Sequence, residues 1–249
     1  DVELTSKLMH HLQTEGKGFS NDSIRLEHNV RAILDQQEAT GFALDVPYTT
    51  AFMAKLEDEA DQIERDLQEV FKPVVHERVS EKTGKRLKDH VEIFNPASRK
   101  QIASRLMERG WEPKQTTEKG NVIIDEKVLS EIDLPEAQQI SHYLLLQKRV
   151  SQLRSWLEAC IDGRVHGRVM TLKTITARMA HSSPNMAQVP AGYSPYGKEC
   201  RTCWTVSNPE THSLVGTDAS GLELRALAHY IEDDDFTKEV IDGDIHTAN

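Results

Sequence analysis

The sequence has little cysteine, few aromatic residues and no long apolar run. Its 249 residues include three cysteines, an odd number that argues against a disulfide framework and favours a reducing compartment. No apolar run approaches the roughly 20 residues of a membrane-spanning helix, so we expect no membrane association. The chain begins at Asp1 with neither an initiator Met nor a leader peptide, which indicates an internal segment.

The composition is that of a globular protein, but its charge is distributed unevenly. The net charge of −10 argues against a nucleic-acid partner. However, residues 148–201 contain nine Lys or Arg against three Asp or Glu, whereas residues 202–249 contain two against ten. This order suits a protein that binds phosphates with one surface and a divalent cation with the next. Two solvated faces of opposite sign explain the charges equally well.

The first two-thirds of the chain have apolar residues at helical spacing. The pattern predicts a helix that ends near Gly41, a longer one that Asp45 caps with Pro47 in its first turn, and a long one over residues 135–160. The polar stretch 72–90 between them is expected to be an exposed loop or a ragged hairpin.

The pattern changes after Gly163, where strands and turns are expected. Residues 214–217 are predicted to form a buried strand that ends at Asp218, followed by a helix over residues 222–231. Helices first and mixed strands and helices afterwards indicate an α+β fold with a boundary near residue 162.

The strongest chemical signal is the run DASGLELR at residues 218–225. A carboxylate at the end of a buried strand could bind a hard divalent cation, with the Ala219 carbonyl as a second oxygen ligand. The alternative is that Asp218 only caps the following helix. The local residues leave both possibilities open.

The longer run DASGLELRALAHY closely resembles motif A of family A (polymerase I-like) DNA polymerases, in the form of short-tailed bacteriophages. Upstream, TAR at residues 176–178 and PNMAQVP at 184–190 resemble the family's thumb-to-palm motif, with Ala177 in place of the usual Gly. Further matching segments occur in the family's order at residues 95–98, 146–149, 194–197 and 243–247.

The resemblance implies an organisation for the chain. Residues 1–19 would be the tail of a 3′–5′ exonuclease domain, with Asp1 as a stranded metal ligand. Residues 20–161 would form the helical thumb, and residues 162–249 the N-terminal part of the palm. The implied fold is α+β, a helical thumb followed by the first strands and helix of a palm.

The resemblance also implies roles at the acidic end of the chain. Asp218 would be catalytic and, with Ala219, would bind Mg²⁺, of which the complete active site holds two ions. Glu223 would lie over the sugar of the incoming nucleotide, and His246 would contact its triphosphate. The alternatives are a solvent-facing helix glutamate and an exposed histidine near the chain end.

A second group of residues is implied to contact DNA. Arg178 would reach the minor groove at the primer terminus, where acceptor positions depend little on sequence. Asn185 and Gln188 would add neutral donors to the same duplex. A phosphate-facing or salt-bridged arginine and two turn-forming residues remain the alternatives.

The implied function is template-directed DNA synthesis on a primer 3′ end, with primer–template DNA and deoxynucleoside triphosphates as partners. A phage-encoded enzyme in the cytoplasm of a bacterial host is expected. The chain ends at Asn249, before the family's fingers helix and second palm carboxylate, so the fragment alone is expected to be inactive. A noncatalytic primer–template-binding module, or half of a split polymerase completed by a second polypeptide, is the alternative.

Overall fold

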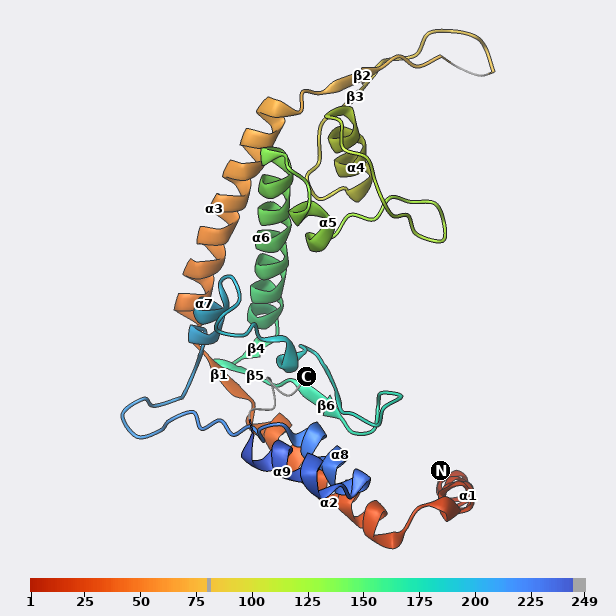
Figure 1. The fold of residues 1–249 in the computed structure, drawn as a ribbon, viewed down its shortest axis with the longest axis vertical. Coiled ribbons are helices and arrows are strands. Elements are labelled where there is room, and N and C mark those ends of the chain that lie inside the picture. The colour runs from red at the N-terminus through yellow and green to blue at the C-terminus, as the bar shows by residue number, and fades with distance from the viewer. Residues whose placement is uncertain (80–81, 244–249) are drawn as a thin grey trace. The chain divides into compact units, whose positions relative to one another are not determined.

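The structure, a computed structural model, describes residues 1–79 and 82–243 (Figure 1). It divides into two compact units, Asp1–Ser207 and Asn208–Asn249. Helices and small antiparallel sheets occur together, which confirms the α+β class. Within the described ranges, no helix is long and apolar enough to span a membrane.

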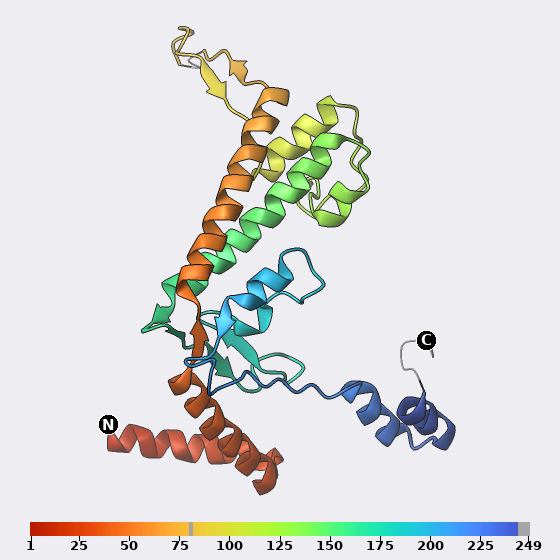
Figure 2. The same ribbon diagram turned by 90° about the vertical axis from the view of Figure 1, so that its left-hand side faces the viewer.

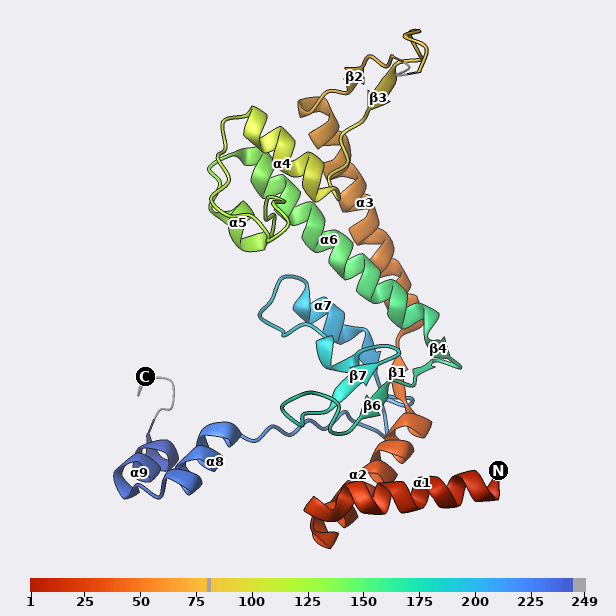
Figure 3. The ribbon, with the colours of Figure 1, turned by 90° about the vertical axis from the view of Figure 1, so that its right-hand side faces the viewer.

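Two long helices that lie side by side form the centre of the first unit (Figures 1 to 3). Helix α3 (Val46–Val70) begins as predicted, because the Asp45 carboxylate accepts a hydrogen bond from the Tyr48 N–H at 3.0 Å. Helix α6 (Pro135–Glu158) has proline in its first turn. Both helices bury apolar residues at intervals of three and four against each other.

The helix pair supports two apolar cores. One contains Trp156, which is 1% exposed and packs edge-on against Trp204 with ring centroids 5.0 Å apart. The other surrounds Phe71 and Phe94, whose rings lie 4.6 Å apart. Burial of such a side chain stabilises the fold by about 1.5–3 kcal/mol.

The second core is covered by α4 (Arg99–Glu108) and α5 (Glu126–Ser130), which Ser98 and Asp125 cap. Strands β2 (Val74–His76) and β3 (His90–Glu92), which follow α3 in the chain, form a hairpin, with an isolated bridge between Val79 and Arg86. Within residues 72–79 and 82–90 the chain therefore forms a ragged hairpin, one of the two predicted forms.

A small antiparallel sheet at the first core joins distant parts of the chain. Its strands lie in the order β4 (Cys160–Ile161), β5 (Arg164–Val165), β1 (Phe42–Leu44) and β8 (Trp204–Thr205). A separate hairpin consists of β6 (Arg168–Met170) and β7 (Ala180–Ser182). Strands after Gly163 were predicted, but β1 was not, and its partners are more than 100 residues away in the sequence.

Three helical segments precede this sheet. They are α1 (Val2–Glu15), the 3₁₀ turn η1 (Gly16–Gly18) and α2 (Asn21–Thr40). Helix α1 buries none of its residues and α2 buries only Leu34. Gly41 ends α2 with a φ of 64°, and a Cβ there would lie 2.8 Å from the Val165 carbonyl oxygen, so only glycine fits.

The second unit contains α8 (Leu222–Ile231) and α9 (Asp234–Asp242), which pack together through Ala228 and Val240. The predicted buried strand over residues 214–217 is wrong. The segment has no regular secondary structure, Val215 is 87% exposed, and no described residue pairs with this stretch. A strand needs a neighbour for its N–H and C=O groups, and apolar spacing alone does not supply one.

Candidate nucleic-acid interface and metal-binding carboxylate

Arg178 lies on an exposed turn that connects β6 to β7. Thr174 holds this turn, since its Oγ1 accepts a hydrogen bond from the Arg178 N–H at 2.8 Å and its own N–H donates to the Arg178 carbonyl at 3.2 Å. The Ala177 N–H also donates to the Thr174 carbonyl, at 2.9 Å. The backbone of Arg178 is therefore fixed, while the residue is open to solvent.

Ala177 adopts the left-handed conformation, with a φ of 60°. Ala177 stands in place of the usual glycine of the motif that the sequence resembles, and glycine adopts this conformation readily. A Cβ in this region costs about 1–2 kcal/mol. The turn that displays Arg178 therefore stores backbone strain.

We expect Ala177→Gly to raise the free energy of unfolding. The relief of about 1–2 kcal/mol is partly offset by roughly 0.4–1 kcal/mol of added backbone entropy in the unfolded chain. Ala32→Gly, at an exposed position within α2, is the matched control and should lower stability by about 1 kcal/mol. Urea unfolding of the three proteins measures both changes, and a loss at Ala177→Gly would contradict the strained turn.

Asn185 and Gln188 lie at the two ends of a single turn. Asn185 Oδ1 accepts a hydrogen bond from the Ala187 N–H at 3.1 Å and caps the 3₁₀ turn η2 (Met186–Gln188). The Gln188 carbonyl accepts one from Gln152 Nε2 of α6 at 2.7 Å. Asn185 therefore forms the turn, which is the alternative interpretation of this residue, and its Oδ1 is used in the hydrogen bond to the backbone.

A groove of about 500 Å³ runs between this turn and α6. Besides Asn185 and Gln188, the exposed Lys148 contributes a positive charge to its lining. The structure therefore brings two of the three predicted DNA contacts together and adds a cation that the sequence did not single out. A groove lined by Lys148, the buried Arg149 and neutral polar groups suits a phosphate backbone.

Two arginine side chains hold the loop between η2 and α7 by hydrogen bonds to its carbonyl oxygens. Arg149, which is 8% exposed, donates from Nε and Nη2 to the Pro195 carbonyl at 3.3 and 3.2 Å. Arg201 Nε, on α7 (Gly197–Thr202), donates to the Pro190 carbonyl at 2.9 Å. These two arginines belong to the basic stretch, but their role is structural.

Tyr196 adds a third anchor. Its hydroxyl donates to Glu59 Oε1 at 3.0 Å and lies 2.9 Å from His142 Nε2. Burial, followed by this carboxylate, raises the pKa of Tyr196 to about 12, so the tyrosine stays protonated. The loop between η2 and α7 is therefore held against both α3 and α6.

Asp218 and Ala219 lie in the exposed segment before α8. Helix α8 has Gly221 as its N-cap residue, at a φ of 58°, and no side chain caps it. The alternative that Asp218 caps this helix is therefore wrong. Arg225 Nε donates to the Ser220 carbonyl at 3.0 Å and holds the turn between them.

Glu223 lies in the first turn of α8 and is exposed. It belongs to the same unit as Asp218 and Ala219, whereas the three predicted DNA contacts belong to the first unit. His246 lies outside the described residues. Asp1 is exposed at the start of α1, and its side chain makes no capping hydrogen bond. Nowhere in residues 1–79 and 82–243 do three His, Cys, Asp or Glu side chains form a group that could hold a metal.

Comparison with known proteins decides the family. The sequence model of DNA polymerase family A matches residues 64–249. The chain belongs to this family. The resemblance predicted from motif A is confirmed.

The phage relatives support the same assignment. The DNA-directed DNA polymerases of Escherichia phage T7 and Enterobacteria phage T3 are each 39% identical over 181 residues, which is 65% of this chain and 26% of each relative. The thermostable DNA polymerase I of Thermus aquaticus is 29% identical over 232 residues, which is 89% of this chain and 25% of the relative. The chain thus spans about a quarter of the length of these family A polymerases.

A solved structure shows the fold. The POL domain of Pol1 from M. smegmatis, in complex with DNA primer-template and dNTP, matches 88% of this chain and 36% of its own with a TM-score of 0.69. The two sequences are only 18% identical. The family A chain described here therefore has part of a polymerase fold.

Proposed function

We propose that this chain forms the thumb and the first part of the palm of a template-directed DNA polymerase. The observation that carries the proposal is Asp218, an exposed carboxylate within motif A that does not cap the helix beside it. In this proposal residues 20–161 are the thumb, residues 162–249 begin the palm, and residues 1–19 with Asp1 are the end of an exonuclease domain. Because its relatives include phage enzymes, the protein would act in the cytoplasm of a bacterial host.

The donors at Asp218 fit Mg²⁺, which prefers carboxylate and carbonyl oxygens. Asp218 and the neighbouring Ala219 carbonyl would be two ligands of a larger set, since the described residues contain no group of three His, Cys, Asp or Glu side chains that could hold the metal by themselves. When bound, two Mg²⁺ ions would stabilise negative charge on the primer hydroxyl and on the triphosphate. Asp218 would place its carboxylate where these ions bind.

Glu223 and His246 would bind the incoming deoxynucleoside triphosphate. Glu223 lies five residues after Asp218, in the first turn of α8, where it would exclude a 2′ hydroxyl from the sugar position. His246 would contact the triphosphate. Both assignments rest on the match to the family's motifs.

The first unit would bind primer–template DNA. Arg178 would enter the minor groove from its fixed turn, and the groove beside α6 would receive the backbone through Lys148, Asn185 and Gln188. Contacts of this kind position the duplex without reading its sequence. Such binding weakens as salt rises, because phosphate contacts release counterions.

We expect the 249-residue chain to bind primer–template DNA with a strong dependence on salt. Arg178→Ala should weaken primer–template binding by about 1–3 kcal/mol and leave single-strand binding nearly unchanged. Lys148→Ala should weaken both and reduce the slope of log K against log salt by about one. Fluorescence anisotropy at several salt concentrations measures all of these quantities.

Lys7→Ala provides the control, because Lys7 is exposed on α1 and its Nζ lies 2.8 Å from Glu3 Oε1 of the same helix. It should change neither affinity nor slope. Equal losses on both DNA forms for Arg178→Ala would remove its minor-groove role. A wild-type chain that does not bind primer–template at low salt would overturn the proposed interface.

A further inference from the structure

The β6–β7 hairpin, whose turn bears Arg178, has few internal interactions to hold it in place. Strands β6 and β7 pair only with each other within the described residues, and β6 buries only Val169. A two-stranded hairpin is marginally stable in water. Its position must therefore come from neighbouring elements, and α2 is the helix that packs on β6.

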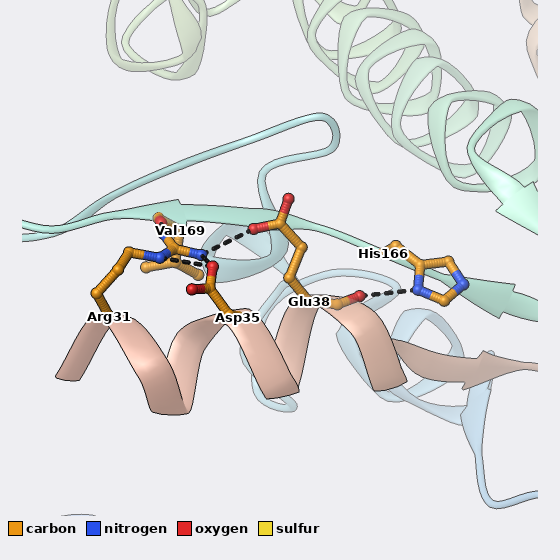
Figure 4. A network of polar contacts seen from close by, with 5 residues as sticks. All are labelled: Arg31, Asp35, Glu38, His166 and Val169. Atoms are coloured by element: carbon orange, nitrogen blue, oxygen red, sulfur yellow. Dashed lines mark hydrogen bonds and ion pairs between the residues drawn. The ribbon is translucent and has the colours of Figure 1, made fainter. Parts of the chain in front are cut away.

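Arg31 of α2 makes the contact that reaches this hairpin (Figure 4). Its Nη1 donates to the Val169 carbonyl of β6 at 2.7 Å. Its other nitrogens bind carboxylates of the same helix, Nε to Asp35 Oδ1 at 2.8 Å and Nη2 to Glu38 Oε2 at 3.2 Å. The two acids lie one and two turns further along α2, so they hold the guanidinium fork in one orientation.

A second contact fixes the segment that leads into β6. His166 Nδ1 lies 2.8 Å from the Glu38 carbonyl oxygen (Figure 4). Glu38 therefore serves both contacts, with its side chain toward Arg31 and its carbonyl toward His166. Since Leu34 is the only residue that α2 buries, these polar contacts are a large part of what joins it to the hairpin.

The pairing of β6 with β7 connects Val169 to the turn that bears Arg178. Val169 is opposite His181, and Met170 is opposite Ala180, two residues after Arg178. A shift of Val169 relative to α2 would therefore displace the turn that bears Arg178. The contribution of an exposed ion pair to stability is only about 0–1 kcal/mol, so orientation is the larger consequence of this network.

We propose that Arg31 is a positioning residue, which binds the β6–β7 hairpin to α2 and so orients the turn that bears Arg178 toward the duplex. The inference rests on the proposed function of Arg178. Four of the five N–H groups of Arg31 are directed at acceptors in the protein, so its guanidinium is committed to the hairpin and to α2 rather than to phosphate. Lysine could not replace it, since a single ammonium cannot span the same three acceptors in a fixed plane.

The test compares Arg31→Ala, Arg31→Lys and the control Arg25→Ala in the 249-residue chain. Arg25 lies on the same helix, and its Nη1 is 3.8 Å from Asp22 Oδ1. The first readout is hydrogen exchange of the backbone amides of residues 169–182 without DNA. Exchange should be at least about threefold faster in both Arg31 variants and unchanged in Arg25→Ala.

The second readout is primer–template binding in a double-mutant cycle with Arg178→Ala. Arg31→Ala should weaken binding by about threefold or more alone, leave the salt slope unchanged, and cause no further loss once Arg178 is removed. Additive losses, a slope reduced by one, or full rescue by Arg31→Lys would overturn the inference. If the wild-type chain binds primer–template but the Arg31 variants show unchanged exchange, the positioning role of Arg31 is overturned and the proposed function stands. If exchange is faster in the Arg31 variants but the wild-type chain binds no DNA, the proposed function and the positioning role are both overturned.

Discussion

Replacing Asp218 by Asn is expected to reduce deoxynucleotide incorporation on the order of a thousandfold, because a carboxylate ligand of the catalytic ions contributes several kcal/mol to transition-state stabilisation. The suitable enzyme is a chimera in which this chain replaces the matching segment of the phage T7 polymerase, to which it is 39% identical. Asn keeps the size of the side chain but removes its charge. Single-turnover extension of a labelled primer measures the effect on the chemical step.

The control for this change is Asp235→Asn, which neutralises another exposed aspartate of the same unit, in the first turn of α9. It should leave the rate of incorporation and primer–template binding unaltered. Asp218→Asn should also leave primer–template binding in place, since the loss concerns chemistry. An Asp218 variant that incorporates nucleotides at the wild-type rate would remove this residue from the metal site.

The second large effect is expected for Glu223→Ala in the same chimera. A 2′ hydroxyl on the nucleotide sugar would collide with this carboxylate or displace one of its hydrogen bonds. Discrimination of this steric and polar kind can reach several kcal/mol, more than the roughly 1–3 kcal/mol of one methylene. The variant should therefore raise ribonucleotide over deoxyribonucleotide incorporation by at least about tenfold.

The measured quantity is the ratio of kcat/KM for the two sugars. Glu210→Ala, at an exposed position in the segment before Asp218, is the matched control and should not alter that ratio. Glu223→Ala should also slow the normal substrate less than Asp218→Asn does. An unchanged ratio would show that Glu223 is a surface residue of α8 and that this helix does not face the nucleotide.

Local signals predicted α2, α3, α6 and α8, whereas α1 and α7 were not predicted. Asp45 caps α3 as predicted, because an Asx side chain satisfies free N–H groups whatever the rest of the fold does. Strand β1 was missed, since three residues between two helices have no pattern of their own. Its partners Val165 and Trp204 become neighbours only when the chain folds.

The candidate site was predictable in part, because motifs name residues but not their contacts. The run from Asp218 drew attention to the carboxylate, yet only the structure separates it from a helix cap. Among the many basic residues, the sequence could not tell that Arg149 is buried against a carbonyl or that Arg31 holds a strand. The role proposed for Lys148 likewise follows from the groove that it lines, which only the structure shows.

The most direct test of the account is template-directed incorporation by the T7 chimera that contains this chain. Each of the four deoxynucleotides is offered opposite each of the four template bases, with Mg²⁺ present. We expect extension only with the complementary nucleotide, and loss of that extension in Asp218→Asn. A folded chimera that binds primer–template but adds no nucleotide, or adds all four without regard to the template, would contradict the claim that this chain supplies part of a DNA polymerase active site.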